Sequence, residues 1–252
     1  MAPRASWAAP SADVSFLASG AALLRVEPPG VITIHGVGDV LRIEAGGFSS
    51  RSVGTLLRRA ASEGVIVHAL CHAAADAVIA VLKLDRASVV VALPGIDRVE
   101  PAMPGRDDDD AAAVGVVTGT NPALDVSMVD SICQRGVKAE LIDAAAAATS
   151  RSCVVFASAD DGFPFAALEA LARDTPVVVP RSPTTTEILE GAVSLVDAHT
   201  ASDLADAAVA LATSDAHRGL AVAAGRARAG DFSCHGRATE LVTVLRRARA
   251  AR

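Results

Sequence analysis

Short runs of apolar and β-branched residues recur along the first part of the chain, between stretches with helical spacing. Residues 30–34 (GVITI), 76–81 (DAVIAV) and 88–93 (SVVVAL) have the composition of buried strands. Residues 52–63 place apolar side chains on one side and arginines on the other, which predicts a helix, and 68–75 continues as a second helical stretch. Strands that alternate with helices predict parallel βαβ units in a doubly wound sheet.

A segment rich in proline, glycine and aspartate at 100–110 (EPAMPGRDDDD) interrupts this alternation. Such a composition is typical of a linker between domains. Its four adjacent aspartates are more typical of a solvated loop than of a cation site. We therefore predict a Rossmann-like domain at 1–99, a linker at 100–112 and a second Rossmann-like domain at 113–252, whose last helix packs back on the first domain.

The second part of the chain repeats the alternation. Its predicted strands are 113–118, 138–142, 153–156, 176–179 and 193–196. Its predicted helices are 125–135, 164–173, 184–189, 202–213, 215–229 and 233–251. Thr184 and Glu187 form a capping-box pattern at the start of the third of these helices. The predicted fold class is thus α/β, with two doubly wound parallel sheets.

The composition fits this fold and excludes one class of partner. Apolar residues make up 51% of the 252 residues and aromatic residues only 3%, so the core is built from small aliphatic side chains. The net charge of −6, with no lysine- or arginine-rich stripe interleaved with aromatic residues, excludes nucleic acid as a partner. The four cysteines are far apart and form no CxxC pair, which predicts buried thiols of a cytosolic protein.

The apolar runs are too short for a membrane span, which needs roughly 18 residues. Residues 14–24 mimic a signal-peptide core but lack a clustered basic start. The basic end at 245–252 (LRRARAAR) suits the C-terminus of a helix, and peripheral contact with an anionic membrane is the alternative. We expect a soluble, cytoplasmic protein, and the sequence leaves its oligomeric state open.

Two acids, Asp161 and Glu169, stand eight residues apart around the sequence Gly-Phe-Pro-Phe. Gly162 permits a turn and Pro164 suits the first position of a helix. A helix N-terminus that follows a parallel strand favours an anion such as a diphosphate, and carboxylates accept hydrogen bonds from sugar and ribose hydroxyls. The arrangement therefore suits a nucleotide sugar. The alternative is that an aspartate caps the helix while Glu169 faces solvent.

The run 160–189 (DDGFPFAALEALARDTPVVVPRSPTTTEIL) resembles the donor-site signature of retaining GT-B glycosyltransferases, the glycogen-synthase and mannosyltransferase-like group called glycosyl transferases group 1. Asp161 occupies the position of the first glutamate of that signature and Glu169 that of the second. Gly162-Phe163 and the sequence TPVV align with it without a gap. Farther upstream, 31–36 (VITIHG) looks like the family's strand that leads to an active-site histidine, here His35.

This resemblance implies a GT-B fold of two Rossmann-like domains. It implies transfer of a sugar, with retention, from a nucleotide-sugar donor to an unidentified saccharide, lipid or small-molecule acceptor, without a cofactor or metal. By resemblance, Glu169 binds the ribose of the donor and Asp161 contacts the transferring sugar. The diphosphate lies beside Gly162, Phe163 and Pro164, and His35 lies near the reacting sugar.

The sequence also departs from the family's pattern. The arginine and lysine that hold the donor diphosphate have no counterpart in 111–126, and Arg135, Lys138 and Arg181 are the candidates to replace them. The chain between 97 and 161 is short by about one βαβ unit of roughly 30 residues. The first domain, without the family's opening strand, is a truncated one. The alternative function is therefore an inactive remnant that binds a nucleotide or a partner; a sugar-nucleotide epimerase is less well supported.

The sequence HALCH contains His68, Cys71 and His72, and its place in a predicted helical stretch puts the two histidines on one helical face. Zinc requires a third and a fourth ligand, which the sequence does not supply nearby. We therefore predict no metal site there.

Overall fold

The computed structural model describes residues 15–17, 28–36, 48–96, 113–119, 121–148, 152–157, 162–197 and 200–250. The chain divides into two compact units, unit 1 (residues 1–95 and 235–252) and unit 2 (residues 96–234). Each unit contains its own sheet of parallel strands. The predicted linker at 100–112 lies outside the described residues.

Unit 1 contains a four-stranded sheet in the order β1-β2-β3-β4. Its strands are β1 (Ser15–Leu17), β2 (Gly30–Ile34), β3 (Ile66–Ala69) and β4 (Val89–Val91). Its helices are α2 (Phe48–Ser62), α3 (His72–Leu82), the 3₁₀ turn η1 (Arg86–Ser88) and α10 (Cys234–Ala250). The chain thus returns to unit 1 through its last helix.

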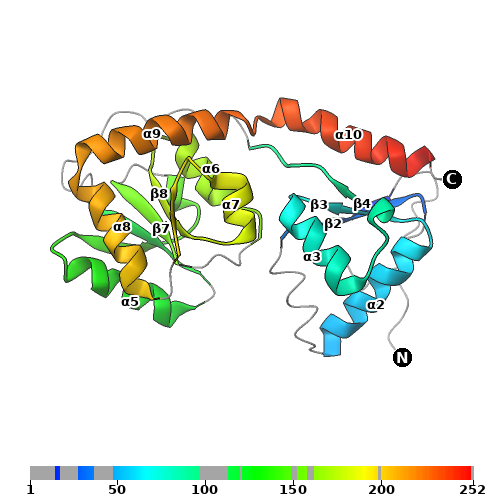
Figure 1. Cartoon of the computed structure of the whole chain (residues 1–252), viewed down its shortest axis with the longest axis horizontal. Coiled ribbons are helices and arrows are strands. Elements are labelled where there is room, and N and C mark those ends of the chain that lie inside the picture. Colours follow the sequence, from blue (N-terminus) through cyan, green and yellow to red (C-terminus); the bar gives the residue numbers. More distant parts are fainter. Residues whose placement is uncertain are drawn as a thin grey trace. The chain divides into compact units, whose positions relative to one another are not determined.

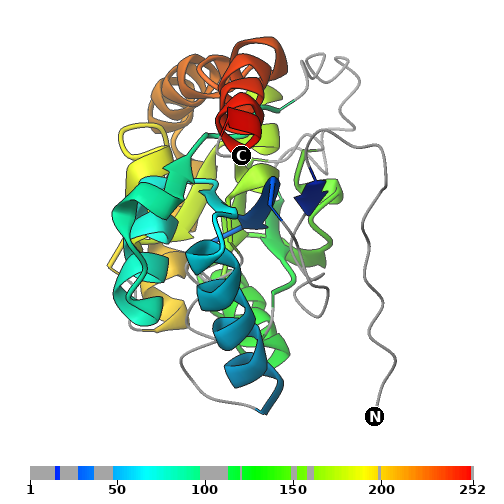
Figure 2. The same ribbon diagram turned by 90° about the vertical axis from the view of Figure 1, so that its right-hand side faces the viewer.

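Helices cover both faces of this sheet (Figure 2). On one face, Ile34 and Val67 pack with Leu57 of α2 and with Val78 of α3. On the other face, a second apolar cluster joins the strands to α10. Its buried members are Val31, Ile66, Ala92, Val244 and Ala248. The two faces carry different residues because successive side chains of a strand point in opposite directions.

The segment 66–82 differs from its sequence-based prediction. The stretch predicted as the second helix begins within strand β3, and the predicted strand at 76–81 is the interior of helix α3. Cys71 caps α3 by accepting a hydrogen bond from the N–H of Ala74, at 3.4 Å. A continuous apolar run does not distinguish a buried helix from a strand, and the alanines that flank it favour the helix.

Unit 2 contains a five-stranded sheet in the order β6-β5-β7-β8-β9. Its strands are β5 (Val114–Val117), β6 (Ala139–Ile142), β7 (Cys153–Phe156), β8 (Val177–Pro180) and β9 (Ser194–Val196). Its helices are α5 (Pro122–Cys133), the 3₁₀ turn η2 (Ala146–Ala148), α6 (Phe165–Ala172), α7 (Pro183–Leu189), α8 (Ala201–Thr213) and α9 (Asp215–Gly230).

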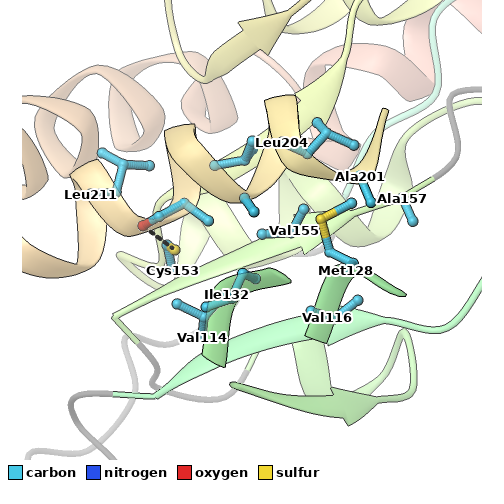
Figure 3. Close-up of a cluster of buried hydrophobic side chains, with 13 residues drawn as sticks. Val114, Val116, Met128, Ile132, Cys153, Val155, Ala157, Ala201, Leu204 and Leu211 are labelled. Carbon is cyan, nitrogen blue, oxygen red and sulfur yellow. Dashed lines mark hydrogen bonds between the residues drawn. The ribbon is translucent and has the colours of Figure 1, made fainter. Parts of the chain in front are cut away.

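The sheet of unit 2 lies between two helical layers, with α5 and α8 on one face and α6 and α9 on the other (Figure 1). The core under α5 and α8 is built from small aliphatic side chains, as the composition predicts (Figure 3). Met128 and Ile132 of α5 and Leu204 of α8 pack there against Val116 and Val155 of the strands. This α/β architecture of parallel sheets confirms the predicted fold class.

The sequence predicts four buried cysteines, but the structure buries only two of them. Cys71 and Cys153 are buried, but Cys133 and Cys234 are exposed. Burial raises the pKa of the Cys153 thiol to about 12. Its Sγ donates to the carbonyl of Ala208, at 3.6 Å.

Helix α7 also begins differently from the prediction. Ser182, rather than Thr184, is its capping residue, and the capping box pairs Ser182 with Thr185. None of the helices in the described part of the chain is long and apolar enough to cross a membrane.

Candidate functional site

The order of the strands in unit 2 indicates where a ligand would bind. From β5 the chain continues to β6 on one side and then crosses to β7 on the other side of β5. The order thus reverses between β5 and β7. In open parallel sheets, ligands bind outside the carboxyl ends of the strands at such a reversal. Among the described residues, 118–119 and 121 follow β5 at this end of the sheet, and 157 and 162–164 follow β7; the second group includes predicted donor-site residues.

The second of these groups ends in a tight turn that is built around one aromatic side chain. Gly162 has a φ of +81°, which glycine adopts without strain. The ring of Phe163 is 4% exposed, and its centroid lies 4.8 Å from that of Phe165 and 6.0 Å from that of Phe232. The side chain of Phe163 is therefore part of the core. Only its backbone is available to contact a ligand at the predicted position.

Helix α6 begins with free backbone amides. Its N-cap residue is Pro164, which makes no side-chain capping bond, and its first turn contains no acid. The N–H of Phe165 is bonded to the carbonyl of Phe163, and that of Leu168 to the carbonyl of Pro164. The N–H groups of Ala166 and Ala167, between them, have no backbone acceptor in the described part of the chain. Such amides, together with the helix dipole, attract an anion.

Among the helices of unit 2 that the structure describes, α6 alone starts with neither a side-chain capping hydrogen bond nor a capping box. Side chains cap the other four helices: Asn121 on α5, Ser182 on α7, Thr200 with Asp203 on α8, and Ser214 on α9. Capping satisfies the first amides of a helix and so removes them from a ligand. The anion-binding capacity at this end of the sheet is therefore concentrated at α6.

Glu169 lies in the second turn of α6 and is half-buried. Its carboxylate has no hydrogen-bond or ion-pair partner among the residues that the structure describes. A carboxylate accepts hydrogen bonds and offers no donor, so it suits a pair of hydroxyl groups. One helix thus presents amides for an anion at its start and an acceptor for hydroxyls one turn later.

The predicted site residues fall in different parts of the chain. Gly162, Phe163, Pro164 and Glu169 lie together on one loop and helix of unit 2, whereas Asp161 lies outside the described residues. His35 directly follows β2, at the carboxyl end of that strand in unit 1, and is partly buried.

The loop 118–121 and the start of α5 contain two residues that the sequence analysis had not selected. Asn121 caps α5 by accepting from the N–H of Leu124 at 3.3 Å. The side chain of Asp125 is 2% exposed, and its Oδ2 accepts from the N–H of Gly119 at 2.9 Å. Its Oδ1 has no hydrogen-bond partner among the described residues. The pair Asn121-Pro122 is a recognisable start of a helix, but the burial of Asp125 leaves no sequence signal.

The candidate cations occupy three different places. Arg135 donates to Asp206 at 2.6 Å and to Ser202 at 2.7 Å, both on α8. Lys138 precedes β6, at the amino end of the strands and away from the start of α6. Lys138 therefore does not lie at the carboxyl ends of the strands where α6 begins, and the guanidinium of Arg135 is already paired on α8.

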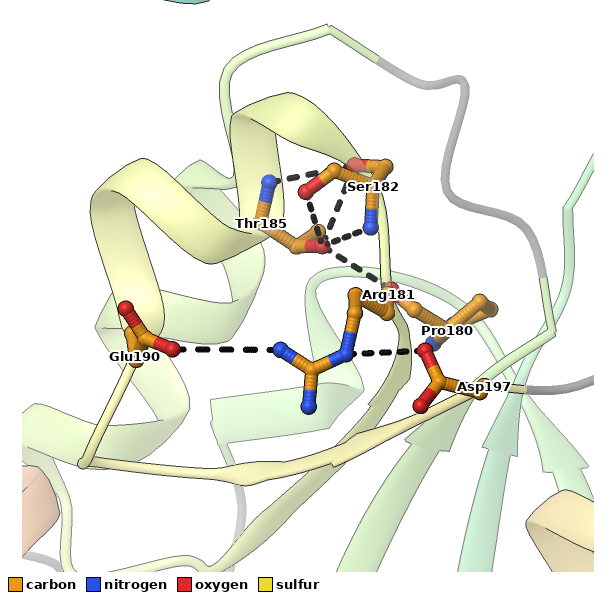
Figure 4. A network of polar contacts seen from close by, with 6 residues as sticks. All are labelled: Pro180, Arg181, Ser182, Thr185, Glu190 and Asp197. Carbon is orange, nitrogen blue, oxygen red and sulfur yellow. Dashed lines mark hydrogen bonds and ion pairs between the residues drawn. The ribbon is translucent and has the colours of Figure 1, made fainter.

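Arg181 directly follows β8 and so lies at the same end of the sheet as the start of α6, between the carboxylates of Glu190 and Asp197 that Figure 4 shows. Its Nε lies 2.8 Å from Asp197, and a guanidinium nitrogen lies 3.8 Å from Glu190. Its backbone N–H donates to the carbonyl of Val196 at 2.7 Å. The side chain is 40% exposed and is directed toward β9, the neighbour of β8, because its partner Asp197 directly follows that strand. Arg181 is thus a cation at the same end of the sheet as the start of α6, and it is paired with two carboxylates.

The histidines of HALCH do not share a helical face. His68 is on strand β3, and His72 is the first residue of α3. Burial lowers the pKa of His68, as does the proximity of His35, against the opposing effect of its hydrogen bond to the carbonyl of Ala92. Within the described ranges no three histidine, cysteine, aspartate or glutamate side chains come together as a metal site.

Part of the chain matches a known protein family. The family model for glycosyl transferases group 1 matches residues 106–214, which include the strand reversal and all of α6. Among curated proteins, a sequence comparison finds no match.

Solved structures of other proteins share the fold at low sequence identity. A point mutant of TarM from S. aureus, in complex with fondaparinux, alpha-GlcNAc-glycerol and UDP, has a TM-score of 0.68 and 12% identity over 86% of this chain and 50% of its own. Anabaena HepE, in complex with UDP and glucose, has a TM-score of 0.68 and 17% identity over 88% and 72%. Sucrose-phosphate synthase from Thermosynechococcus elongatus has a TM-score of 0.66 and 15% identity over 89% and 69%. The chain thus spans half the length of TarM, and these likenesses identify the fold as GT-B.

Proposed function

We propose that the protein is a glycosyltransferase that transfers a sugar from a nucleotide-sugar donor to a hydroxyl-bearing acceptor, with unit 2 as the donor-binding unit. The observation that carries the proposal is the combination on α6 of uncapped N-terminal amides with a half-buried Glu169 that has no partner among the described residues. A nucleoside diphosphate needs both features, an anion site and an acceptor for ribose hydroxyls. UDP is present in the similar structures of TarM and HepE, which supports the same class of ligand for this chain.

Each predicted residue has a role in this proposal. Glu169 accepts hydrogen bonds from the ribose, and Asp161 accepts from the transferring sugar. The backbone at Gly162 and Phe163 and the start of α6 bind the diphosphate. His35 of unit 1 acts near the reacting sugar, and transfer proceeds with retention. The proposal assigns no role to a metal ion. A saccharide acceptor is favoured because TarM is seen with fondaparinux and alpha-GlcNAc-glycerol.

Stabilisation of the leaving group distinguishes this proposal from its alternative. A diphosphate leaves more easily beside a cation, and we assign that role to Arg181. The alternative is a protein that binds the nucleotide without transferring the sugar. It is favoured by one observation, namely that the side chains of Arg135 and Arg181 are already paired with carboxylates.

A binding experiment tests the donor site. Thermal unfolding is measured with UDP-, GDP- and ADP-sugars for the wild type, for Glu169→Ala and for Asp130→Ala, an exposed acid on α5 that serves as a matched control. A ligand at 100 times its Kd stabilises the folded state by about 2.7 kcal/mol, which corresponds to roughly 5–10 °C in Tm. Hydrogen bonds to a charged group contribute about 1.5–3 kcal/mol, so Glu169→Ala is expected to weaken binding about 10- to 100-fold.

The outcomes separate the alternatives. If no nucleotide raises the Tm of the wild type, the donor-site proposal is wrong. If Glu169→Ala responds like Asp130→Ala, the nucleotide binds elsewhere. If UDP-glucose binds but no UDP is released in the presence of any saccharide acceptor, the binding-only alternative is correct.

A further inference from the structure

The carboxylate of Asp125, in the first turn of α5, is an unusual polar group of unit 2. The side chain is 2% exposed, yet only one of its two oxygens has a hydrogen-bond partner among the described residues. That partner is the N–H of Gly119, in the loop that follows β5. Buried polar atoms are nearly always hydrogen-bonded. A carboxylate oxygen without a partner, near the carboxyl ends of the strands where a ligand would bind, therefore requires an explanation.

Most of the described backbone donors around this carboxylate are already used. Pro122 has no N–H, and the N–H groups of Leu124 and Asp125 donate to the carbonyl of Asn121, at 3.0 and 3.1 Å. The N–H of Gly119 donates inward to Asp125. Of the first residues of α5, Ala123 alone keeps an amide without a backbone acceptor in the described part of the chain.

The buried carboxylate also offsets the positive end of the dipole of α5. A helix N-terminus carries a partial positive charge of roughly one half, and a carboxylate in the first turn neutralises it. In a poorly solvated position that carboxylate is only weakly screened, so it repels a second anion over several ångströms. The two helix N-termini at the strand reversal therefore differ, since α5 is capped and negatively charged whereas α6 is uncapped and has no first-turn acid.

We propose that Asp125 is a specificity-determining residue that excludes anions from the β5–α5 loop and so fixes the orientation of the bound ligand. The anionic part of the ligand lies at α6, and the part that faces loop 118–121 is uncharged and carries hydroxyl groups. The identity of the ligand as a nucleotide sugar rests on the function proposed above, but the exclusion of anions does not.

Removal of the charge of Asp125 tests the inference, because it should raise the affinity of the protein for an anion. Asp125→Asn keeps the size of the side chain and an acceptor for the N–H of Gly119, but it removes the charge. The control Asp130→Asn removes the same charge from an exposed position on the same helix. By isothermal titration calorimetry, we expect Asp125→Asn to bind inorganic pyrophosphate about 10-fold more tightly than the wild type, and Asp130→Asn to match the wild type. A merely structural role for Asp125 predicts weaker binding.

A second measurement uses the wild type alone and so does not depend on the folding of a variant. Titration with pyrophosphate, followed by backbone amide NMR, is expected to shift the signals of Ala166 and Ala167 and to leave that of Ala123 unchanged. The inference is overturned if Ala123 shifts instead, or if folded Asp125→Asn shows no gain in pyrophosphate affinity over the wild type.

The same experiments separate this inference from the proposed function. If Asp125→Asn gains affinity for pyrophosphate while the wild type binds no UDP, the anion exclusion stands and the nucleotide-sugar function fails. If the wild type binds UDP through Glu169 and Asp125→Asn gains nothing, the function stands and the role of Asp125 is wrong.

Discussion

Single polar residues at the carboxyl ends of strands set the local chemistry of each unit. In unit 1, His68 is 4% exposed and joins three neighbouring segments of the sheet. Its Nε2 lies 2.9 Å from the carbonyl of Ala92, which can only accept, so Nε2 carries the proton. Its Nδ1, 3.1 Å from Oγ1 of Thr33, then accepts from that hydroxyl. The neutral imidazole thus satisfies both partners, and its charged form is disfavoured by burial.

This arrangement predicts a pH-dependent stability. The pKa of His68 is lowered in the folded state from its usual 6.5, so the unfolded chain takes up the proton first as the pH falls. The stabilisation is fully present above about pH 6.5 and is lost progressively below it. Urea unfolding at pH 7.5 and 5.5 should show a greater loss of unfolding free energy for the wild type than for His68→Gln.

His217→Gln provides the control, because His217 is exposed on α9. It should lose as much unfolding free energy as the wild type over the same pH interval. Equal losses in the wild type and His68→Gln would contradict the assignment of a neutral, buried His68.

At the scale of secondary-structure elements, α6 is held by α9 through a close contact at a glycine. A Cβ atom placed on Gly225 would lie 2.6 Å from Cδ2 of Leu171, and Leu171 is 1% exposed. A second link joins α9 to the end of α6, where Nε of Arg226 lies 2.8 Å from the carboxylate of Asp174. Since α6 contains the candidate donor site, this packing fixes the helix on which the ligand would bind.

We therefore expect Gly225→Ala to destabilise the protein by about 1–3 kcal/mol, because an added methyl group overpacks a dense contact. Gly219 is the matched control on the same helix, since nothing lies within 4 Å of a Cβ placed there. Gly219→Ala should stabilise by up to about 1 kcal/mol through its higher helix propensity. Chemical unfolding of both variants measures the two effects, and a Gly225→Ala variant as stable as the wild type would contradict the close packing.

At the scale of the whole molecule, the chain folds into two units with separate sheets and separate cores. The core of unit 2 includes residues of α5, α8 and the strands β5, β7 and β8. The first and last segments of unit 2 are hydrogen-bonded to each other. The N–H of Ile96, its first residue, donates to the carbonyl of Phe232, near its last residue, at 2.7 Å. The last helix, α10, packs instead on the sheet of unit 1, where Glu240 accepts from the N–H of Leu93 at 3.2 Å.

A unit with its own sheet and core should fold alone. We expect the fragment 96–234 to show cooperative thermal unfolding and the circular dichroism of an α/β protein. If the nucleotide binds through α6, the fragment should also retain binding within about tenfold of the whole chain. A fragment that remains unfolded would show that unit 2 depends on unit 1, whereas a folded fragment that does not bind UDP would place part of the donor site elsewhere.

The sequence by itself determined the alternation of strands and helices, the α/β class and the local signature from Gly162 to Glu169. These features depend on neighbours along the chain: β-branched runs, turn-forming glycine and the spacing of apolar residues. The same local rules misassigned 76–81, because a short apolar run fits a strand as well as a buried helix.

Only the tertiary structure decided which strand lies beside which, and therefore where the strand order reverses. It also decided that Asp125 is buried with one orphaned oxygen among the described residues, that Arg135 is paired on α8, and that Arg181 lies at the edge where α6 begins. A side chain's partners across the fold depend on packing between residues far apart in sequence. No local pattern specifies them, because the same aspartate or arginine would suit a solvated surface equally well.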